Sequence, residues 1–228
     1  MSVLGKVFWA TGYKVYRTIG KYVDLEPNDY SLRPRTIEYA FAAKQIASRN
    51  VEGRLLDVGC TNAANMIPLF SAMSGIETYG IDIRPWTLRD KKFVFTQGDI
   101  RHTKFSDRFF DCICAISTVE HIGLKQYSQD KEDSNSDKHV MEEIERIIKP
   151  SGILILTVPF GIRKRIGNAC DIYDSKKILD MSRHWNILEE LYYNRINGEM
   201  TAVSKETAEA FECKDGEESL GMFVMAKV

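Results

Sequence analysis

The stretch LLDVGC at residues 55–60 decides the fold. It is an apolar run with a single carboxylate that ends in glycine, which is typical of a buried strand entering a tight turn. A glycine there lets a ligand approach the main chain closely. The complete Gly-x-Gly-x-x-Gly of dinucleotide-binding turns is missing, since Thr61, Ala63 and Ala64 occupy its positions. This departure argues against NAD or FAD, which need a cradle for a pyrophosphate.

Acidic residues end the next two expected strands. YGIDI at 79–83 places Asp82 where a carboxylate that binds both ribose hydroxyls is expected. QGDI at 97–100 places Asp99 where it can accept from an adenine amino group, with Ile100 covering the ring. The alternative for Asp99 is a turn in which its side chain caps the backbone. In the first motif, Asp57 can accept a hydrogen bond from an ammonium group.

A fourth motif, FDCICAISTVEHI at 110–122, is a strand that leads into an acid–imidazole pair. In an open parallel sheet, ligands bind beyond the carboxyl ends of the strands, where the strand order reverses. We expect Glu120 and His121 to lie at that point.

The whole chain alternates apolar runs with helical segments, which indicates a sheet buried on both faces and the α/β class. Residues 33–228 are expected to form a single domain, preceded by an N-terminal amphipathic helix and loop at 1–32. The expected strands are 54–58, 77–81, 92–96, 109–116, 153–158, 186–193 and 222–228. The expected helices are 35–48, 62–73, 138–148 and 174–181.

Residues 3–23 read as a helix with an apolar stripe opposite a lysine- and arginine-rich side. Two interpretations stay open. The stripe packs on the domain or on a second subunit, as in a homodimer, or it forms a peripheral contact with anionic lipid. The stripe consists of Leu4, Phe8, Val15, Ile19 and Tyr22.

Composition sets the class of protein. Apolar residues make up 44% of the chain and charged residues 28%, as in soluble globular domains. A net charge of −1 argues against nucleic acid as a partner. Five cysteines without a Cys-x-x-Cys pair predict reduced thiols and a cytoplasmic location. We expect no metal, because the acidic segment 129–138 does not continue as a calcium loop: Ile144 stands where its bidentate glutamate belongs.

With these motifs followed by ERIIKPSGILILTVPFG at 145–161, residues 33–195 resemble the class I S-adenosylmethionine-dependent methyltransferases. More narrowly they resemble methyltransferase-11-like enzymes linked to glycan and lipopolysaccharide synthesis. The resemblance implies a Rossmann-like three-layer α/β/α sandwich. Its seven-stranded, mostly parallel sheet has the order 3-2-1-4-5-7-6, with strand 7 antiparallel. It also implies S-adenosyl-L-methionine as the cofactor.

The resemblance assigns cofactor contacts by position. The turn after the first strand surrounds the methionine part, Asp82 holds the ribose, and the residues that follow the second and third strands flank the adenine. Ser117 lies under the cofactor. The implied contacts are Asp57, Gly59, Cys60, Asn62, Asp82, Ile83, Asp99, Ile100 and Ser117.

For catalysis, His121 is the candidate base because an imidazole titrates near neutral pH; its alternative role is structural. Glu120 either orients that imidazole or binds the methionine end, or it is a plain helix-start carboxylate. Candidate substrate contacts are Tyr127, Arg163 and Tyr173, and the basic run 163–165 can bind a phosphorylated acceptor or be a solvated loop. Arg33, Arg35 and Tyr39 can close the pocket from the N-terminal side.

The predicted reaction is methyl transfer to a small-molecule acceptor, such as a hydroxyl of a sugar, a nucleotide sugar or a glycolipid precursor. One alternative is a binding or scaffold protein that kept the fold without the activity. The other is an RNA or protein methyltransferase. Against amino-group chemistry on bases stands the tetrad Ser-Thr-Val-Glu at 117–120, which replaces an Asn-Pro-Pro-Tyr-like sequence.

Overall fold

The structure is a computed structural model that describes residues 34–61, 75–86, 93–124, 133, 135–213 and 218–228. All of them belong to one compact unit, Leu32–Val228. Several predictions lie outside the described residues: the N-terminal helix and loop at 1–32, the helix at 62–73, and the contacts Arg33, Asn62 and Tyr127.

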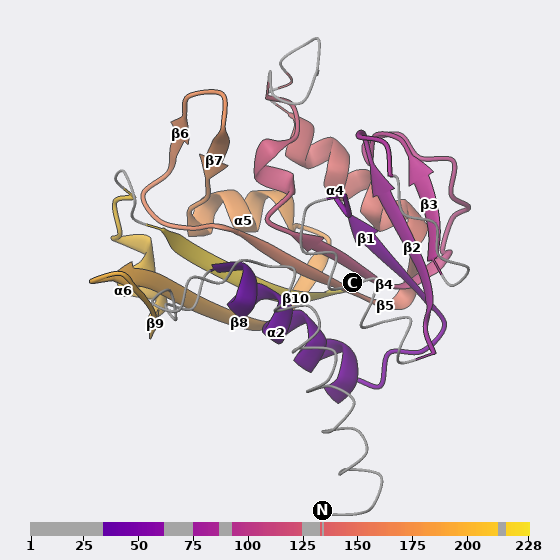
Figure 1. The fold of residues 1–228 in the computed structure, drawn as a ribbon, viewed down its shortest axis with the longest axis horizontal. Helices are drawn as coiled ribbons and strands as arrows, with labels where there is room; N and C mark the ends of the chain where they lie inside the picture. Colours follow the sequence, from indigo (N-terminus) through magenta and orange to yellow (C-terminus); the bar gives the residue numbers. More distant parts are fainter. Residues whose placement is uncertain (1–33, 62–74, 87–92, 125–132, 134, 214–217) are drawn as a thin grey trace, which may run out of the picture. The chain divides into compact units, whose positions relative to one another are not determined.

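An eight-stranded sheet forms the centre of this unit, in the order β3-β2-β1-β4-β5-β10-β8-β9 (Figure 1). Strands β1 to β5 pair in parallel, whereas β10 runs antiparallel to both β5 and β8. The strands are β1 (Arg54–Val58), β2 (Glu77–Asp82), β3 (Phe93–Gln97), β4 (Phe110–Ile116), β5 (Ile148–Pro159), β8 (Trp185–Ile196), β9 (Glu199–Val203) and β10 (Ser219–Lys227).

The predicted order 3-2-1-4-5-7-6 is confirmed, with β8 as the sixth strand and β10 as the antiparallel seventh. The predicted count of seven is wrong, because β9 adds an eighth strand at the edge of β8. The hairpin turns at Asn197 and Gly198, whose φ angles are 53° and 83°. An Asn-Gly pair between strands favours this turn, so the sequence held the signal. A second, two-stranded sheet of β6 (Lys164–Ile166) and β7 (Cys170–Ile172) was not predicted.

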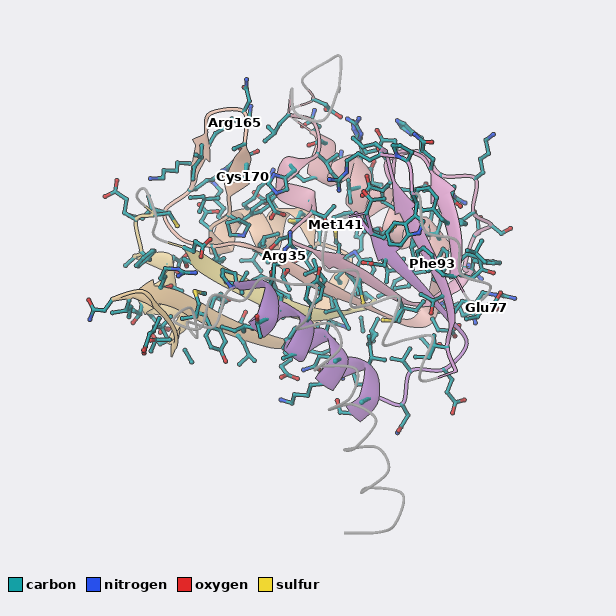
Figure 2. The ribbon with its side chains drawn as sticks, in the orientation of Figure 1. Arg35, Glu77, Phe93, Met141, Arg165 and Cys170 are labelled. Carbon is teal, nitrogen blue, oxygen red and sulfur yellow. The ribbon has the colours of Figure 1, made fainter. Side chains whose placement is uncertain are left out.

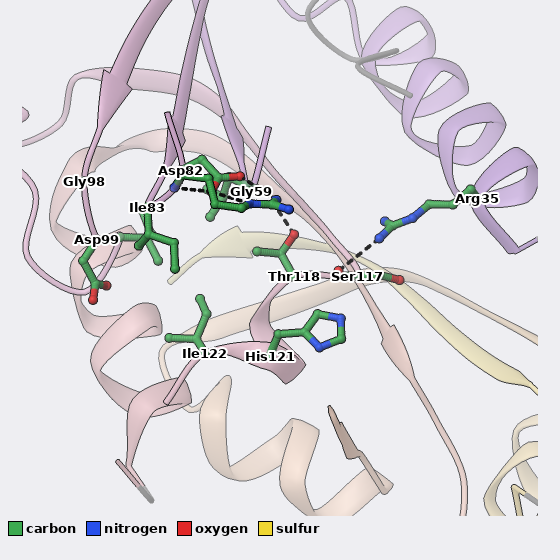
Figure 3. A pocket seen from close by; sticks show the side chains of 13 residues that line it. Arg35, Gly59, Asp82, Ile83, Gly98, Asp99, Ser117, Thr118, His121 and Ile122 are labelled. Atoms are coloured by element: carbon green, nitrogen blue, oxygen red, sulfur yellow. Dashed lines mark hydrogen bonds and ion pairs between the residues drawn. The ribbon is translucent and has the colours of Figure 1, made fainter. Parts of the chain in front are cut away.

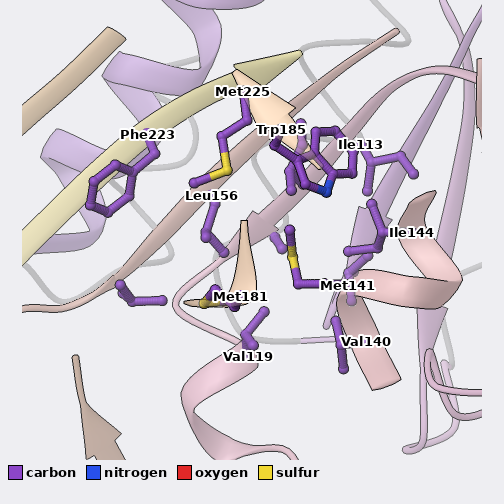
Figure 4. Close-up of a cluster of buried hydrophobic side chains, with 14 of the residues drawn as sticks. Ile113, Val119, Val140, Met141, Ile144, Leu156, Met181, Trp185, Phe223 and Met225 are labelled. Carbon is purple, nitrogen blue, oxygen red and sulfur yellow. The ribbon is translucent and has the colours of Figure 1, made fainter. Parts of the chain in front are cut away.

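Helices cover both faces of the sheet. Side chains alternate between the two faces along each strand, so the central strands present apolar residues to the helices on both sides. Leu55 and Cys112 pack with α2 (Pro34–Ser48) on one face. Leu56 and Ile113 pack with α4 (Ser136–Ile147) and α5 (Ser175–Met181) on the other. Figure 4 shows part of this second cluster, including Ile144 of α4 and Phe223 of β10. The three-layer α/β/α class is therefore confirmed.

The strand order reverses between β1 and β4, because the chain continues from β1 to β2 on one side and returns to β4 on the other. Ligands of open α/β sheets bind beyond the carboxyl ends of the strands at such a point. The short helix η1 (Val119–His121) follows β4 there. The β6–β7 hairpin reaches the same end of the sheet, since His121 Nδ1 lies 2.5 Å from the carbonyl oxygen of Ala169.

All five cysteines are free thiols, and Cys112 and Cys114 are fully buried in β4. Among the described residues, no helix is both long and apolar enough to span a bilayer.

Candidate active site

The turn after β1 brings the ends of β1 and β4 into close contact. Gly59 has a φ of 77°, a left-handed conformation that side chains disfavour. A Cβ at this position would lie 2.5 Å from Thr118 Oγ1, which in turn donates to the carbonyl oxygen of Val58 at 3.1 Å. Both the backbone angle and the crowding require glycine here.

A cleft opens beyond the carboxyl ends of β1 to β4 (Figure 3), the place where open α/β sheets bind their ligands. Residues from four different strand ends meet on its wall, together with His121 of η1. Those predicted from the sequence as cofactor contacts are Gly59, Asp82, Ile83, Asp99, Ile100 and Ser117. The geometric relationship expected from the sequence, in which the Gly59 turn and Asp82 face one crevice, is thus present.

Other predicted site residues lie elsewhere. Cys60 and Glu120 are buried, 3% and 2% exposed, and are not part of the cleft wall. Arg163 is exposed on the segment after β5. Tyr173 is only 2% exposed and packs in the hydrophobic core. Its burial contradicts a direct contact with an acceptor, and its place after a strand did not reveal that its ring fills the core.

Asp57 is a nearly buried carboxylate beside the cleft residue Val58. Burial raises its pKa to about 8, an effect that the Arg35 guanidinium opposes and the Asp82 carboxylate reinforces. Within the described part of the chain, no donor hydrogen-bonds to this side chain. A cationic group of a ligand would supply the missing partner.

The carboxylate of Asp82 is held by donors of its own chain. Thr61 donates to it from its backbone N–H at 3.0 Å and from Oγ1 at 2.7 Å. Arg84 donates from its backbone N–H at 2.9 Å, from Nε at 3.1 Å and from Nη2 at 3.0 Å. Although burial opposes ionisation, these hydrogen bonds keep the pKa of Asp82 below its usual value. Thr61, which stands where the dinucleotide motif has glycine, therefore has a role of its own.

A cluster around Ser117 was missed from the sequence. Ser117 has a φ of 39°, rare for a residue other than glycine and a mark of stored strain. Its hydroxyl donates to the buried Glu38 of α2, to which Thr157 Oγ1 also donates at 2.5 Å. Arg35, on the first turn of α2 (Figure 2), donates to the carbonyl oxygen of Ile116 at 2.7 Å and lies 3.7 Å from the Glu38 carboxylate. Figure 3 shows its second contact, with the carbonyl oxygen of Ser117 at 3.3 Å.

Glu120 and His121 differ in their surroundings. Burial raises the pKa of Glu120 to about 8, and its Oε2 has no hydrogen-bond partner among the described residues. Burial lowers the pKa of His121. The contact of Nδ1 with the Ala169 carbonyl oxygen assigns the proton of the neutral ring to Nδ1. Nε2, 3.8 Å from Glu120 Oε1, is then the basic nitrogen of an imidazole on the cleft wall.

Residues 56–156 match the methyltransferase domain family. This segment runs from β1 into β5 and contains the carboxyl ends of the four strands that line the cleft. A search of curated proteins found no match.

Solved structures with the same fold cover most of the chain. A putative sarcosine dimethylglycine methyltransferase from Galdieria sulphuraria has a TM-score of 0.59 at 14% identity, covering 90% of this chain and 91% of that one. A SAM-dependent methyltransferase from Methanosarcina mazei has 0.54 at 15%, covering 80% and 97%. The [4+2]-cyclase SpnF has 0.56 at 16%, covering 89% and 84%. At this identity the likeness establishes the fold.

S-adenosyl-L-methionine is the cofactor that the resemblance and the methyltransferase-domain match imply for this cleft. The side chains fit this group: Gly59 leaves room that a Cβ would fill, and the buried Asp57 carboxylate suits an ammonium group. Ile83 and Ile100 offer apolar surface for a base. Among the described residues, no cluster of three or more His, Cys, Asp or Glu side chains could hold a metal ion.

Proposed function

We propose that this protein is an S-adenosyl-L-methionine-dependent methyltransferase that methylates a hydroxyl group of a small molecule. The observation that carries the proposal is the shared cleft, which the Gly59 turn, Asp82 and His121 all line. When bound, S-adenosyl-L-methionine supplies an electrophilic methyl group on a positively charged sulfur.

Each part of the cofactor is bound by residues from a different strand end. The Asp57–Cys60 turn binds the amino-acid end of the cofactor, Asp82 accepts from the ribose, and Asp99 and Ile100 hold the base. Ser117 lies under the cofactor. Holding two reactants in line supplies most of the rate enhancement of such a displacement.

His121 is proposed as the base that takes the proton from the acceptor hydroxyl. The Ala169 carbonyl oxygen fixes Nδ1 as the donor, so Nε2 is the ring nitrogen that carries no proton. Because burial lowers the pKa of His121, the ring is neutral and able to accept a proton at pH 7. Glu120, whose Oε1 lies 3.8 Å from Nε2, is proposed to orient the ring.

A sugar, a nucleotide sugar or a glycolipid precursor is the proposed acceptor, in keeping with the resemblance to enzymes of glycan and lipopolysaccharide synthesis. Arg35 on the cleft wall and the exposed Arg163 after β5 offer cations for a phosphorylated acceptor. A cytoplasmic location, a homodimer and a peripheral membrane contact through residues 3–23 stay predictions from the sequence.

A binding protein without methyl-transfer activity is the second candidate. The observation that favours it is the Asp82 carboxylate, which donors of the same chain already occupy. The fold also allows other reactions, since one solved structure with this fold is named a [4+2]-cyclase. An RNA or protein methyltransferase is a third candidate; one solved structure with this fold, from Haloferax volcanii, is a putative methyltransferase in complex with the Trm112 activator.

Two measurements test the proposal in turn. Calorimetry with S-adenosylhomocysteine should show binding to the purified chain, and an absence of binding would rule out the proposed function. A coupled assay for S-adenosylhomocysteine release should then show turnover with one member of a panel of sugars and nucleotide sugars. Binding without turnover on hydroxyl, RNA and protein acceptors would favour the binding protein.

A further inference from the structure

Two Asp-Ile-Arg tripeptides end neighbouring strands of the sheet, at 82–84 after β2 and at 99–101 after β3. They have the same internal geometry. In each, the arginine backbone N–H donates to the aspartate Oδ1 at 2.9 Å, and Nε donates to the same oxygen at 3.1 Å. Each arginine therefore folds back on the aspartate two residues before it.

The surroundings of the two arginines differ. The Arg101 side chain is 16% exposed, and its Nη1 also donates to Asp133 at 3.1 Å, so two carboxylates fix it. The Arg84 side chain is 38% exposed and forms part of the cleft wall. The first guanidinium supports the structure, while the second lies at the surface that a ligand would contact.

Arg84 occupies the oxygens of Asp82 that a ribose would use. The carboxylate receives five donors, two from Thr61 and three from Arg84. An ionised carboxylate offers about four lone-pair sites. A ribose whose two hydroxyls donate to this carboxylate needs some of those sites. The ribose and the Arg84 guanidinium therefore compete for the same acceptor atoms.

We infer that the Arg84 side chain is a removable cover on the ribose-binding carboxylate of Asp82. Its guanidinium must leave Asp82 before the hydroxyls of an adenosyl ligand can bind, whereas Arg101 stays on Asp99. The inference rests on the proposed function, because it takes the cleft as an adenosyl site. It makes Arg84 a residue that lowers the affinity for ligands with a ribose diol.

Calorimetry on the full chain tests this inference, with S-adenosylhomocysteine as the probe because its net charge is near zero. Arg84→Ala should bind it about fivefold more tightly than the wild type, the factor expected for a half-exposed ion pair that no longer has to be broken. Adenosine should show the same ratio, and 2′,3′-dideoxyadenosine a ratio near one, because it has no diol. Equal or weaker binding of S-adenosylhomocysteine by the variant would overturn the inference.

Two further variants distinguish the occupation of Asp82 by Arg84 from a general effect of positive charge on ligand affinity. Arg84→Lys keeps the charge but cannot span both carboxylate oxygens, so it should give an intermediate gain. Arg101→Ala removes the matched guanidinium from Asp99, the proposed base contact, and should lower the melting temperature. Any gain in affinity from this variant should be the same for adenosine and 2′,3′-dideoxyadenosine, because Asp99 does not hold the diol. A gain from Arg101→Ala that is confined to ligands with the diol would overturn the inference, because the effect would then not depend on freeing Asp82.

The outcomes distinguish the inference from the function on which it rests. Equal binding of S-adenosylhomocysteine by the wild type and Arg84→Ala would rule out the covering role of Arg84 and would still support the adenosyl site. If neither the wild type nor any variant binds S-adenosylhomocysteine or adenosine, both the role of Arg84 and the proposed function are ruled out. A crystal structure with S-adenosylhomocysteine gives an independent readout: the cover requires the Arg84 guanidinium to have moved off Asp82.

Discussion

Thr118 occupies the space that a side chain on residue 59 would need. A Cβ on Gly59 would lie 2.5 Å from Thr118 Oγ1 and 2.6 Å from Cγ2. Because Oγ1 also donates to the carbonyl oxygen of Val58, Thr118 ties the end of β4 to the end of β1. The turn that faces the cleft is thus fixed from behind by the neighbouring strand.

The first prediction concerns this contact. Gly59→Ala should lower the free energy of unfolding by more than about 2 kcal/mol, since it adds a clash to an unfavourable backbone angle, and it should weaken S-adenosylhomocysteine binding. Gly75→Ala is the matched control, because Gly75 has a φ of 80° and no atom of the described residues lies within 4 Å of an added Cβ. Urea unfolding of the two variants measures the difference. Equal losses would mean that the Thr118 contact contributes nothing.

A second prediction follows from the buried carboxyl groups of Asp57 and Glu120. Burial raises both pKa values to about 8, so the folded protein keeps these protons at pH values where the unfolded chain has lost them. The free energy of unfolding should therefore fall as the pH rises from about 5 to about 8. Asp57→Asn should make this fall shallower, by up to about 1 kcal/mol per pH unit. An unchanged slope in the variant would contradict the account.

The same carboxyl group predicts a proton release on binding. If an ammonium group of the ligand pairs with Asp57, it favours the ionised form, so S-adenosylhomocysteine should bind more tightly as the pH rises from about 6 to about 8. Calorimetry in buffers of different ionisation enthalpy counts the protons released. Asp57→Asn should abolish the release, and a release that persists in this variant would place its origin elsewhere.

A fourth prediction concerns Arg35 and Glu38. Arg35→Met leaves the buried Glu38 carboxylate without its cation and should cost about 2 kcal/mol of unfolding free energy. Adding Glu38→Gln should recover part of that loss, which a double-mutant cycle measures. The control is Lys44→Met on the same helix, whose ion pair with Glu189 at 3.8 Å is exposed. It should cost less than about 1 kcal/mol. Strictly additive losses in the cycle would show that Arg35 and Glu38 do not interact.

His121 gives a kinetic prediction. With the acceptor found by the screen, His121→Gln should lower kcat about 100-fold, as for a lost general base, while S-adenosylhomocysteine affinity changes little. Because burial lowers the pKa of His121, kcat/KM in the wild type should rise with pH, with a midpoint below the ordinary histidine value of about 6.5. Full activity of the variant would assign His121 a structural role.

Features of the fold and the site that depend on residues close together in the sequence could be predicted, whereas those that depend on distant residues could not. The positions of the seven strands, of Gly59 and of Asp82 follow from local patterns, so they could be predicted. The strand order came only from the resemblance to a known family. The edge strand β9 was also readable, from the Asn197-Gly198 pair. The repeated Asp-Ile-Arg was visible as well, but only coordinates show that one of its arginines lies on the cleft wall.

The buried position of Glu38 could not be predicted from local sequence patterns. A carboxylate on a helix normally faces water, and only its spacing from Phe41 and Gln45, which share its buried face, hinted otherwise. Its partners Ser117 and Thr157 lie far along the chain, so no local pattern could identify them. The prediction of Tyr173 as a substrate contact was wrong for the same reason, because the burial of its ring is set by packing between distant segments.

The Gly59 turn and Asp82 are proposed to bind one adenosyl ligand between them. A crystal structure of the full chain with S-adenosylhomocysteine tests this proposal. The ribose hydroxyls should lie within about 3.2 Å of the Asp82 carboxylate, with the amino-acid end of the ligand at the turn formed by residues 57–60. A ligand bound outside this cleft, or one that contacts only one of the two sites, would contradict it.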